Sequence, residues 1–139
     1  MTAPSPNRLQ VAEKFMTSLG RSDVDGVVNL LSPDATYRVV GDHSLSGTFS
    51  AGEILDHLMA LITSTSGTLD ATKFVDWLIG DQFVACVTQI TFHGTGRRFS
   101  GHVVFLFRFD SVELIDRVTV FYEDADAVAR FFGEKSPGG

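Results

Sequence analysis

The sequence predicts an α+β domain in which helices cover one face of a mostly antiparallel sheet. The apolar residues first recur at helical spacing, and from Leu69 onward they alternate along the chain. Two turn-forming segments, Gly94-Thr95-Gly96 and Asp110-Ser111, separate the alternating runs as hairpin turns do. The chain also contains 12 Phe against 2 Tyr and 1 Trp, which indicates a strongly apolar interior.

Two helices are predicted before the first strand. Ser5 suits the N-cap of the first helix, Pro6 its first helical position and Gly20 its end. Its inward stripe is Leu9, Ala12, Phe15, Met16 and Leu19. A second, short helix is expected from Ser22 or Asp23 to Ser32-Pro33, because the residue before a proline disfavours helix. Its inward stripe is Val24, Val27, Val28 and Leu31.

The remaining elements follow in order. Residues 35–40 predict an early strand, and Ser50 and Glu53 have the spacing of a capping box that opens a third helix. The stripe of this helix is Ile54, Leu58, Leu61 and Ile62. An antiparallel meander of alternating runs is expected at 73–79, 83–93, 99–109 and 112–122. Asp124 then caps a last short helix, with Ala125, Val128, Phe131 and Phe132 inward.

Length and charge restrict the class of protein. The 139 residues predict one domain at 7–133, with a disordered tail at 1–6 and a flexible tail at 134–139. With 11 basic and 17 acidic residues the net charge is −6, which argues against a nucleic-acid binder. No apolar run approaches the roughly 20 residues of a membrane helix, and the first six residues lack the apolar stretch of a signal peptide. We therefore expect a soluble, cytoplasmic protein without membrane partners.

No cofactor or metal is predicted. Cys86 is the single cysteine, so no internal disulfide forms, and it is interpreted as an inert core thiol. The histidines at 43, 57, 93 and 102 do not have the spacing of metal ligands. His57 lies at the border of the third helix, flanked by Ile54, Leu58 and Leu61. It either edges into the pocket or, as we expect of a histidine at a helix border, reaches solvent.

The turn positions predict the strand pairing. If Thr95-Gly96 is a two-residue turn, Phe92 faces Phe99 and Cys86 faces Phe105; if Ser111-Val112 is the next, Phe107 faces Asp116. The covered face is then Val84, Cys86, Thr88, Ile90, Phe92, Phe99, Val103, Phe105, Phe107, Leu114, Asp116, Val118, Val120 and Tyr122. The opposite face holds Gln89 opposite His102, with His102 next to Phe121, and this mixed surface predicts the interface of a homodimer.

The segment from Asp23 to Tyr37 (DVDGVVNLLSPDATY) resembles the helix-to-strand segment of the nuclear transport factor two-like superfamily, which includes the SnoaL-like cyclases. Gly47-Thr48-Phe49, Phe107-Arg108-Phe109-Asp110 and Phe121-Tyr122-Glu123-Asp124 also match, and the resemblance covers nearly all of 7–133. It implies a cone-shaped curved sheet wrapped by three N-terminal helices and enclosing a pocket. Because this fold hosts enzymes, binding proteins and transport adaptors, the resemblance does not fix a reaction.

Two well-understood activities of the superfamily do not transfer. The acid–base positions of ketosteroid isomerase fall on Phe15, Val39 and Phe105, none of which exchanges protons. For limonene-epoxide hydrolase, Tyr37 matches the tyrosine that holds water. The other positions fall on Val39, Cys86, Thr88 and Val120. Neither reaction therefore has its standard residues in this chain.

Asp116 and Tyr37 are the catalytic candidates. As a carboxylate on the covered face, Asp116 would have its pKa raised by desolvation and could transfer protons, as the pocket Asp of SnoaL-like cyclases does. The alternative is a strand-end carboxylate at the rim, solvated or paired with Arg117 or Arg108. Tyr37 and Tyr122 either donate to a ligand carbonyl or bond to backbone in the core, and Trp77 lines the mouth or packs.

Two functions follow from these patterns. The first is an apolar pocket for a polycyclic or lipid-like molecule, with or without isomerase or cyclase activity. Its predicted lining is Phe15, Tyr37, Val39, Leu58, Trp77, Cys86, Thr88, Val103, Phe105, Val118, Val120 and Tyr122. The alternative is a non-catalytic dimeric domain that fills its own interior and binds partners through the polar sheet face.

Overall fold

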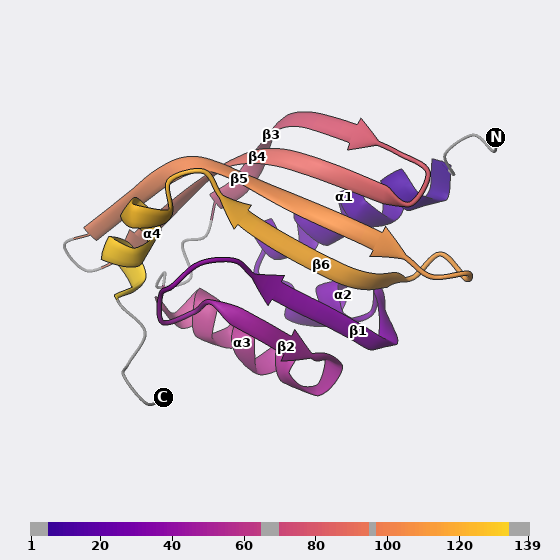
Figure 1. Cartoon of the computed structure of the whole chain (residues 1–139), viewed down its shortest axis with the longest axis horizontal. Helices are drawn as coiled ribbons and strands as arrows, with labels where there is room; N and C mark the ends of the chain where they lie inside the picture. Colours follow the sequence, from indigo (N-terminus) through magenta and orange to yellow (C-terminus); the bar gives the residue numbers. More distant parts are fainter. Residues whose placement is uncertain (1–5, 65–69, 95–96, 134–139) are drawn as a thin grey trace.

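The computed structural model describes residues 6–64, 70–94 and 97–133. Its elements are α1 (Pro6–Gly20), α2 (Val24–Val28), β1 (Leu31–Val39), β2 (Gly47–Ser50), α3 (Ala51–Ser64), β3 (Asp70–Ile79), β4 (Phe83–Gly94), β5 (Arg97–Phe109), β6 (Ile115–Tyr122) and α4 (Ala125–Phe132). The strands form one sheet in the order β2-β1-β6-β5-β4-β3 (Figure 1). β1 and β6 run parallel and the other neighbours antiparallel. The predicted α+β class is confirmed.

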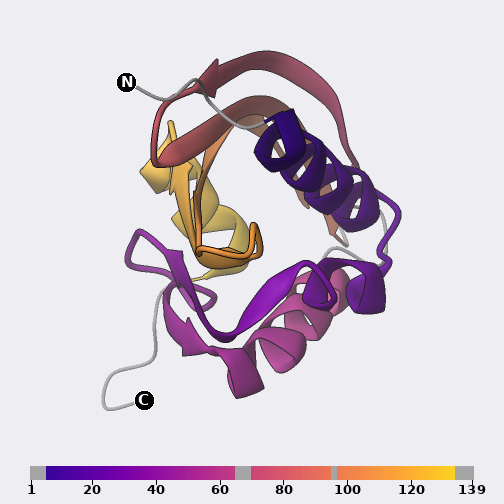
Figure 2. The same cartoon turned by 90° about the vertical axis from the view of Figure 1, so that its right-hand side faces the viewer.

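The helices close one side of a strongly curved sheet. α1 packs against β3 and β4, α3 against β1 and β2, and α2 lies against both helices. Viewed along the molecule, the sheet bends around an interior that α1, α2 and α3 close, and α4 contacts β5 (Figure 2). The face of the sheet turned away from these helices, here called the outer face, is the one seen in Figure 1.

Hydrogen bonds from backbone N–H groups to carboxylate side chains cap the starts of three helices. The Asp23 carboxylate accepts from Gly26 N at the start of α2, and the Asp124 carboxylate accepts from Ala127 N at the start of α4, each at 3.0 Å. At α3, Glu53 accepts from the backbone N of Ser50 (3.0 Å) and its hydroxyl (2.7 Å), as the capping-box spacing predicts.

A search of the described residues for a helix with the length and apolar character of a membrane span found none.

The region between α2 and α3 differs from the prediction. α2 ends at Val28, and Leu31, which was expected on its inward stripe, instead begins β1 and pairs with Ile115. Sheet pairing with β6 competes successfully here with the weak helical preference of a short valine-rich segment. β2 was not predicted. Its four residues are too few to show a clear alternation of apolar and polar side chains, and the strand is defined by its pairing with β1.

The pairing predicted for β4 and β5 is confirmed. Phe92 lies opposite Phe99, Thr88 opposite Val103 and Cys86 opposite Phe105. Gly94 pairs with Arg97, while the expected turn residues 95–96 lie outside the described residues.

The pairing predicted for β5 and β6 was wrong by two residues. Phe107 faces Val118, and Phe121 faces Val104 rather than His102. The connection is longer than a two-residue turn: Asp110 Oδ1 accepts from the backbone N of Val112 and of Leu114, and β6 begins only at Ile115. Because the shift is an even number, Val118, Val120 and Tyr122 keep their predicted face.

The core lies on the face that the helices cover. Almost all residues assigned to this face have exposed fractions of 4% or less: Val84, Cys86, Thr88, Ile90, Phe92, Phe99, Val103, Phe105, Phe107, Val118 and Val120. From the helices, Ala12, Phe15, Met16, Leu19, Ile54 and Leu58 pack against them. The sequence pattern therefore identified the covered face correctly, with the exceptions of Leu114 and Asp116.

Candidate functional site

Most residues of the predicted pocket meet inside the cone. The following are buried in one continuous core: Phe15, Tyr37, Val39, Leu58, Cys86, Thr88, Val103, Phe105, Val118 and Val120. Trp77 and Tyr122 lie at its border, partly buried and packed against it. The structure thus brings the predicted lining residues together. That they contact a ligand stays a prediction.

Asp116 is not on the covered face, and this part of the prediction was wrong. A β-bulge pairs Arg108 with Arg117 but Phe109 with Ile115, so Asp116 is turned to the outer face. There its two oxygens accept from Arg108 Nε (2.9 Å) and Nη2 (3.0 Å), as the alternative interpretation expected. This hydrogen bond to Asp116 raises the pKa of Arg108. Asp116 therefore cannot act as a base inside the cone.

Besides the hydroxyl of Thr88, the polar groups of the interior are rings rather than carboxylates. Tyr37 on β1 lies beside His57 on α3, with ring centroids 5.3 Å apart, and Phe49 stacks on His57 at 4.2 Å. On its other side Tyr37 stacks with Phe15 at 6.5 Å. Tyr37 is 1% exposed and His57 6%, so the prediction that His57 reaches solvent was wrong.

Burial keeps this pair uncharged at neutral pH. Desolvation raises the pKa of Tyr37 far above its usual range, and the charge of Tyr122 adds to this effect. Desolvation also lowers the pKa of His57 to about 4, with a further contribution from His43. Among the side chains whose burial the structure describes, no Asp, Glu, Lys or Arg is buried. The interior thus offers neutral hydrogen-bonding groups in an apolar wall.

A second polar ring lies where the β1–β2 loop meets α4. His43 is 2% exposed, stacks on Phe132 at 5.5 Å and contacts the Tyr122 ring edge-on at 5.9 Å. Ser44 holds the loop to the helix end, donating from its hydroxyl to Phe132 O (2.7 Å) and from its backbone N to Gly133 O (3.0 Å). Burial lowers the pKa of His43, although Asp42 opposes the shift.

Cys86 and His102, the remaining candidates, add no reactive group to the interior. Burial raises the pKa of the Cys86 thiol to about 12, so this thiol stays protonated and unreactive. His102 is on the outer face opposite Gln89, with its ring nitrogen 3.5 Å from Glu123. Across the described residues, no three His, Cys, Asp or Glu side chains converge in a way that could hold a metal ion.

Hollows lined by described residues lie on the outside of the molecule. One of about 430 Å³ follows the exposed side of α1, from Gln10 to Arg21. Another, of about 370 Å³, lies on the outer face beside Asp34, Asp116 and Arg117. Around Tyr37 the rings of Phe15, Phe105 and Phe107 are in mutual contact, with centroids 5.0 to 6.3 Å apart. The rings next to Tyr37 at Phe15 are therefore closely packed.

The sequence contained a pattern for one of the two buried histidines. Ile54, His57, Leu58 and Leu61 have the i, i+3, i+4, i+7 spacing of one helix face, which places His57 inward. His43 follows Gly41 and Asp42 in a loop without periodicity, and its burial depends on α4, about 90 residues later in the chain. No local pattern could have identified it.

Comparison with known proteins agrees with this architecture. The family model described as "SnoaL-like domain" matches residues 12–118. A cystatin-like-fold protein of unknown function from Xanthomonas campestris has a TM-score of 0.84 at 21% identity, over 91% of this chain and 98% of its own. An NTF2-like protein from Burkholderia xenovorans scores 0.76 at 18% identity, over 96% and 100% of the two chains.

The crystal structure of TerC, co-crystallised with polyporic acid, scores 0.78 at 13% identity, over 91% and 98% of the two chains. No curated protein matches the sequence significantly. At these identities the solved structures show the fold alone, whereas the family model covers most of the chain. The chain therefore belongs to the SnoaL-like domain family.

Proposed function

We propose that this protein binds an uncharged, mainly apolar small molecule inside the cone, and that Tyr37 and His57 form hydrogen bonds to an oxygen atom of that molecule. The observation that carries the proposal is the neutral Tyr37–His57 pair, set in a wall that is otherwise almost wholly apolar. Ligand sites typically combine apolar walls with a few polar groups that orient the ligand. The co-crystallisation of TerC, which has the same fold, with polyporic acid supports a small-molecule ligand.

The surroundings of the pair favour a polycyclic ligand over a lipid-like one. Phe15 and Tyr37 stack at an interplanar angle of 24°, and Phe49 and His57 at 26°. A flat ring system can replace such ring–ring contacts when it separates the side chains, whereas a flexible chain cannot. Because separation costs free energy, the observed affinity is reduced by that cost.

Binding is favoured over proton-transfer catalysis. A general base works best with a pKa near the operating pH, and His57, with a pKa of about 4, is a weak base at neutral pH. Asp116, the predicted base, is held by Arg108 on the outer face. Tyr37 remains a hydrogen-bond donor that can orient a carbonyl or hydroxyl oxygen.

Replacing Tyr37 by Phe is expected to weaken the binding of 1-naphthol about tenfold, the factor that one hydrogen bond of about 1.4 kcal/mol gives. Binding of naphthalene, which has no oxygen, is expected to stay unchanged in the same variant. Equilibrium dialysis of wild type and variant with both compounds measures the difference. Asp116→Asn is the matched control, and its affinities are expected to equal those of wild type because Asp116 faces outward.

Two results would contradict the proposal. If wild type binds neither compound up to its solubility limit, the cone is not a site for such molecules. If Tyr37→Phe and wild type bind 1-naphthol equally, Tyr37 does not contact the ligand oxygen.

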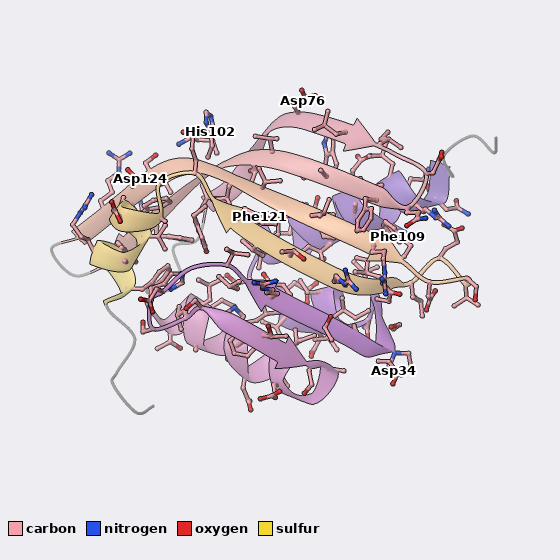
Figure 3. The ribbon with its side chains drawn as sticks, in the orientation of Figure 1. Asp34, Asp76, His102, Phe109, Phe121 and Asp124 are labelled. Atoms are coloured by element: carbon pink, nitrogen blue, oxygen red, sulfur yellow. The ribbon has the colours of Figure 1, made fainter. Side chains whose placement is uncertain are left out.

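We also propose that the outer face forms a homodimer, because a strip of apolar side chains crosses it without a covering helix. Phe121, one of these side chains, is labelled in Figure 3. Val104 lies between Val87 and Phe121 on the neighbouring strands. On β3 the residue opposite Val87 is Asp76, and Leu78 adds an apolar side chain one row further along, opposite Ala85. Phe121 is 40% and Leu78 57% exposed. Exposed apolar patches of this kind are typical of interfaces. Gln89 and His102, the other predicted interface residues, lie at one end of the strip.

Phe121→Asp is expected to convert the dimer to a monomer, because it places a charge in the apolar strip, at its β6 end. Light scattering coupled to size-exclusion chromatography measures the mass of both proteins. Met59→Asp on α3, at 50% exposure, introduces the same charge away from the strip and should leave the dimer intact. A wild-type monomer at high concentration would refute the proposed interface.

A further inference from the structure

His43 is held rigidly although it belongs to a loop. Its backbone N donates to Ser46 Oγ (3.1 Å), and Ser46 Oγ donates back to His43 O (2.7 Å). The ring is fixed between Phe132 and Tyr122, and its Nδ1 accepts from Leu45 N at 3.2 Å. With Nδ1 used as an acceptor, the neutral imidazole carries its hydrogen on Nε2. The donor of this ring is therefore fixed in position.

The Nε2–H group has no acceptor in the part of the chain that the structure describes. Among the side chains that the structure describes, Nε2 of His43 is a fully buried polar atom without a hydrogen-bond partner. The rings of Tyr122 and Phe132 lie next to it, but an aromatic face is a weaker acceptor than an oxygen atom. A buried, unpaired donor destabilises a folded protein, and native structures contain few of them. Such a group is expected where a partner binds.

We propose that His43 Nε2–H donates a hydrogen bond to a second oxygen of the bound molecule, so that the natural ligand is a ring system with oxygens at two separate positions. This inference rests on the proposed function and deepens it. Tyr37 and His57 recognise one oxygen beside α3, and His43 recognises the other at the α4 end of the interior, where Tyr122 borders it.

The two positions belong to one interior rather than to separate sites. Ring contacts join Tyr37 to His57 (5.3 Å) and His43 to Tyr122 (5.9 Å). In agreement with this, Tyr122 contributes to the raised pKa of Tyr37 and His43 to the lowered pKa of His57. Tyr37 and Tyr122 project from neighbouring strands on the covered face, four residues apart in the β1–β6 register. The side chains between these levels, Val39 and Val120, are apolar and buried. A rigid apolar ring system with an oxygen on each side fits this pattern.

Neighbouring backbone supports access to Nε2. Gly41 has φ +144°, and a Cβ built there would lie 3.0 Å from His43 Cδ2 and 3.3 Å from Nε2. A side chain at position 41 would therefore crowd the edge of the ring that carries the unpaired donor. Glycine keeps this edge clear.

The test compares 1-naphthol with 1,5- and 2,6-dihydroxynaphthalene, which present a second oxygen at two different spacings. Wild type is expected to bind at least one of the diols about tenfold more tightly than 1-naphthol. In His43→Phe, which keeps an aromatic ring between Phe132 and Tyr122, this gain is expected to vanish while 1-naphthol binds as before. His102→Phe makes the same change on the outer face and should preserve the gain.

A measurement on wild type alone does not depend on the folding of a variant. The ring Nε2–H resonance of His43, followed by ¹H–¹⁵N NMR, is expected to move downfield with the better diol and to stay in place with naphthalene. If neither diol gains affinity over 1-naphthol, if the gain persists in His43→Phe, or if the resonance does not respond, His43 is not a ligand donor. If 1-naphthol itself does not bind, the proposed function fails and this inference fails with it.

Discussion

Phe107→Ala is expected to lower the free energy of unfolding by about 3–5 kcal/mol, the usual cost of removing a fully buried phenylalanine ring. Phe107 is 0% exposed and lies on β5 between Val84 and Val118. Its ring contacts Phe15 at 5.0 Å and Phe105 at 6.3 Å. Because these partners come from α1 and from the sheet itself, they cannot all move inward, and a cavity remains. Urea unfolding followed by circular dichroism measures the loss.

Met59→Ala is the matched control for this variant. It also truncates a large apolar side chain, but Met59 is 50% exposed on α3. A change of no more than about 0.5 kcal/mol is expected there. Equal losses in the two variants would show that the rings around Phe107 do not form the centre of the core.

Acidification is expected to destabilise the protein through His57. In the folded state the pKa of His57 is about 4, whereas in the unfolded chain it has the ordinary value of about 6.5. Between these values the unfolded state binds the proton and the folded state does not, so stability falls as the pH decreases. The full loss is about 3 kcal/mol below pH 4, and about 2 kcal/mol of it occurs by pH 5. The lowered pKa of His43 acts in the same direction.

His57→Phe tests this assignment. The variant keeps an aromatic ring against Phe49 and Tyr37 but cannot bind a proton. Its free energy of unfolding, measured with urea at pH 7, 6 and 5, is expected to fall less than that of wild type by most of the 2 kcal/mol. If wild type and variant lose stability in parallel, His57 is accessible to protons in the folded state and the interior is not sealed as described.

The covered face was predictable because the alternation of apolar and polar side chains is a local pattern that recurs in each long strand. Each long strand alternates, so a single correct turn fixes many pairs, as the confirmed partners Phe92–Phe99 and Cys86–Phe105 show. The error on β6 was an even number of residues, and Val118 and Val120 therefore stayed on the correct face. Asp116 was misplaced because a bulge changes the alternation at one point, and a bulge depends on how a turn is hydrogen-bonded rather than on residue type.

In the candidate site, too, local spacing could place some residues but not others. The apolar wall, with Tyr37 in it, followed from alternation, and His57 could have been placed inward from its spacing to Ile54 and Leu58. His43 could not, since nothing near it in the chain indicates burial. Its environment is made by Phe132 of α4 and by the hydrogen bonds of Ser44 to the end of that helix.

By itself the sequence determined the α+β class, the helix starts, the covered face and the apolar character of the interior. These depend on residue spacing and on side chains that act within a few positions of one another. The tertiary structure alone decided the location of Asp116 outside the cone, the burial of His43 and the meeting of four neutral rings in one interior. Those features arise where segments that are distant in the sequence pack together. The free energy of such contacts depends on both segments, so no single stretch of the chain predicts it.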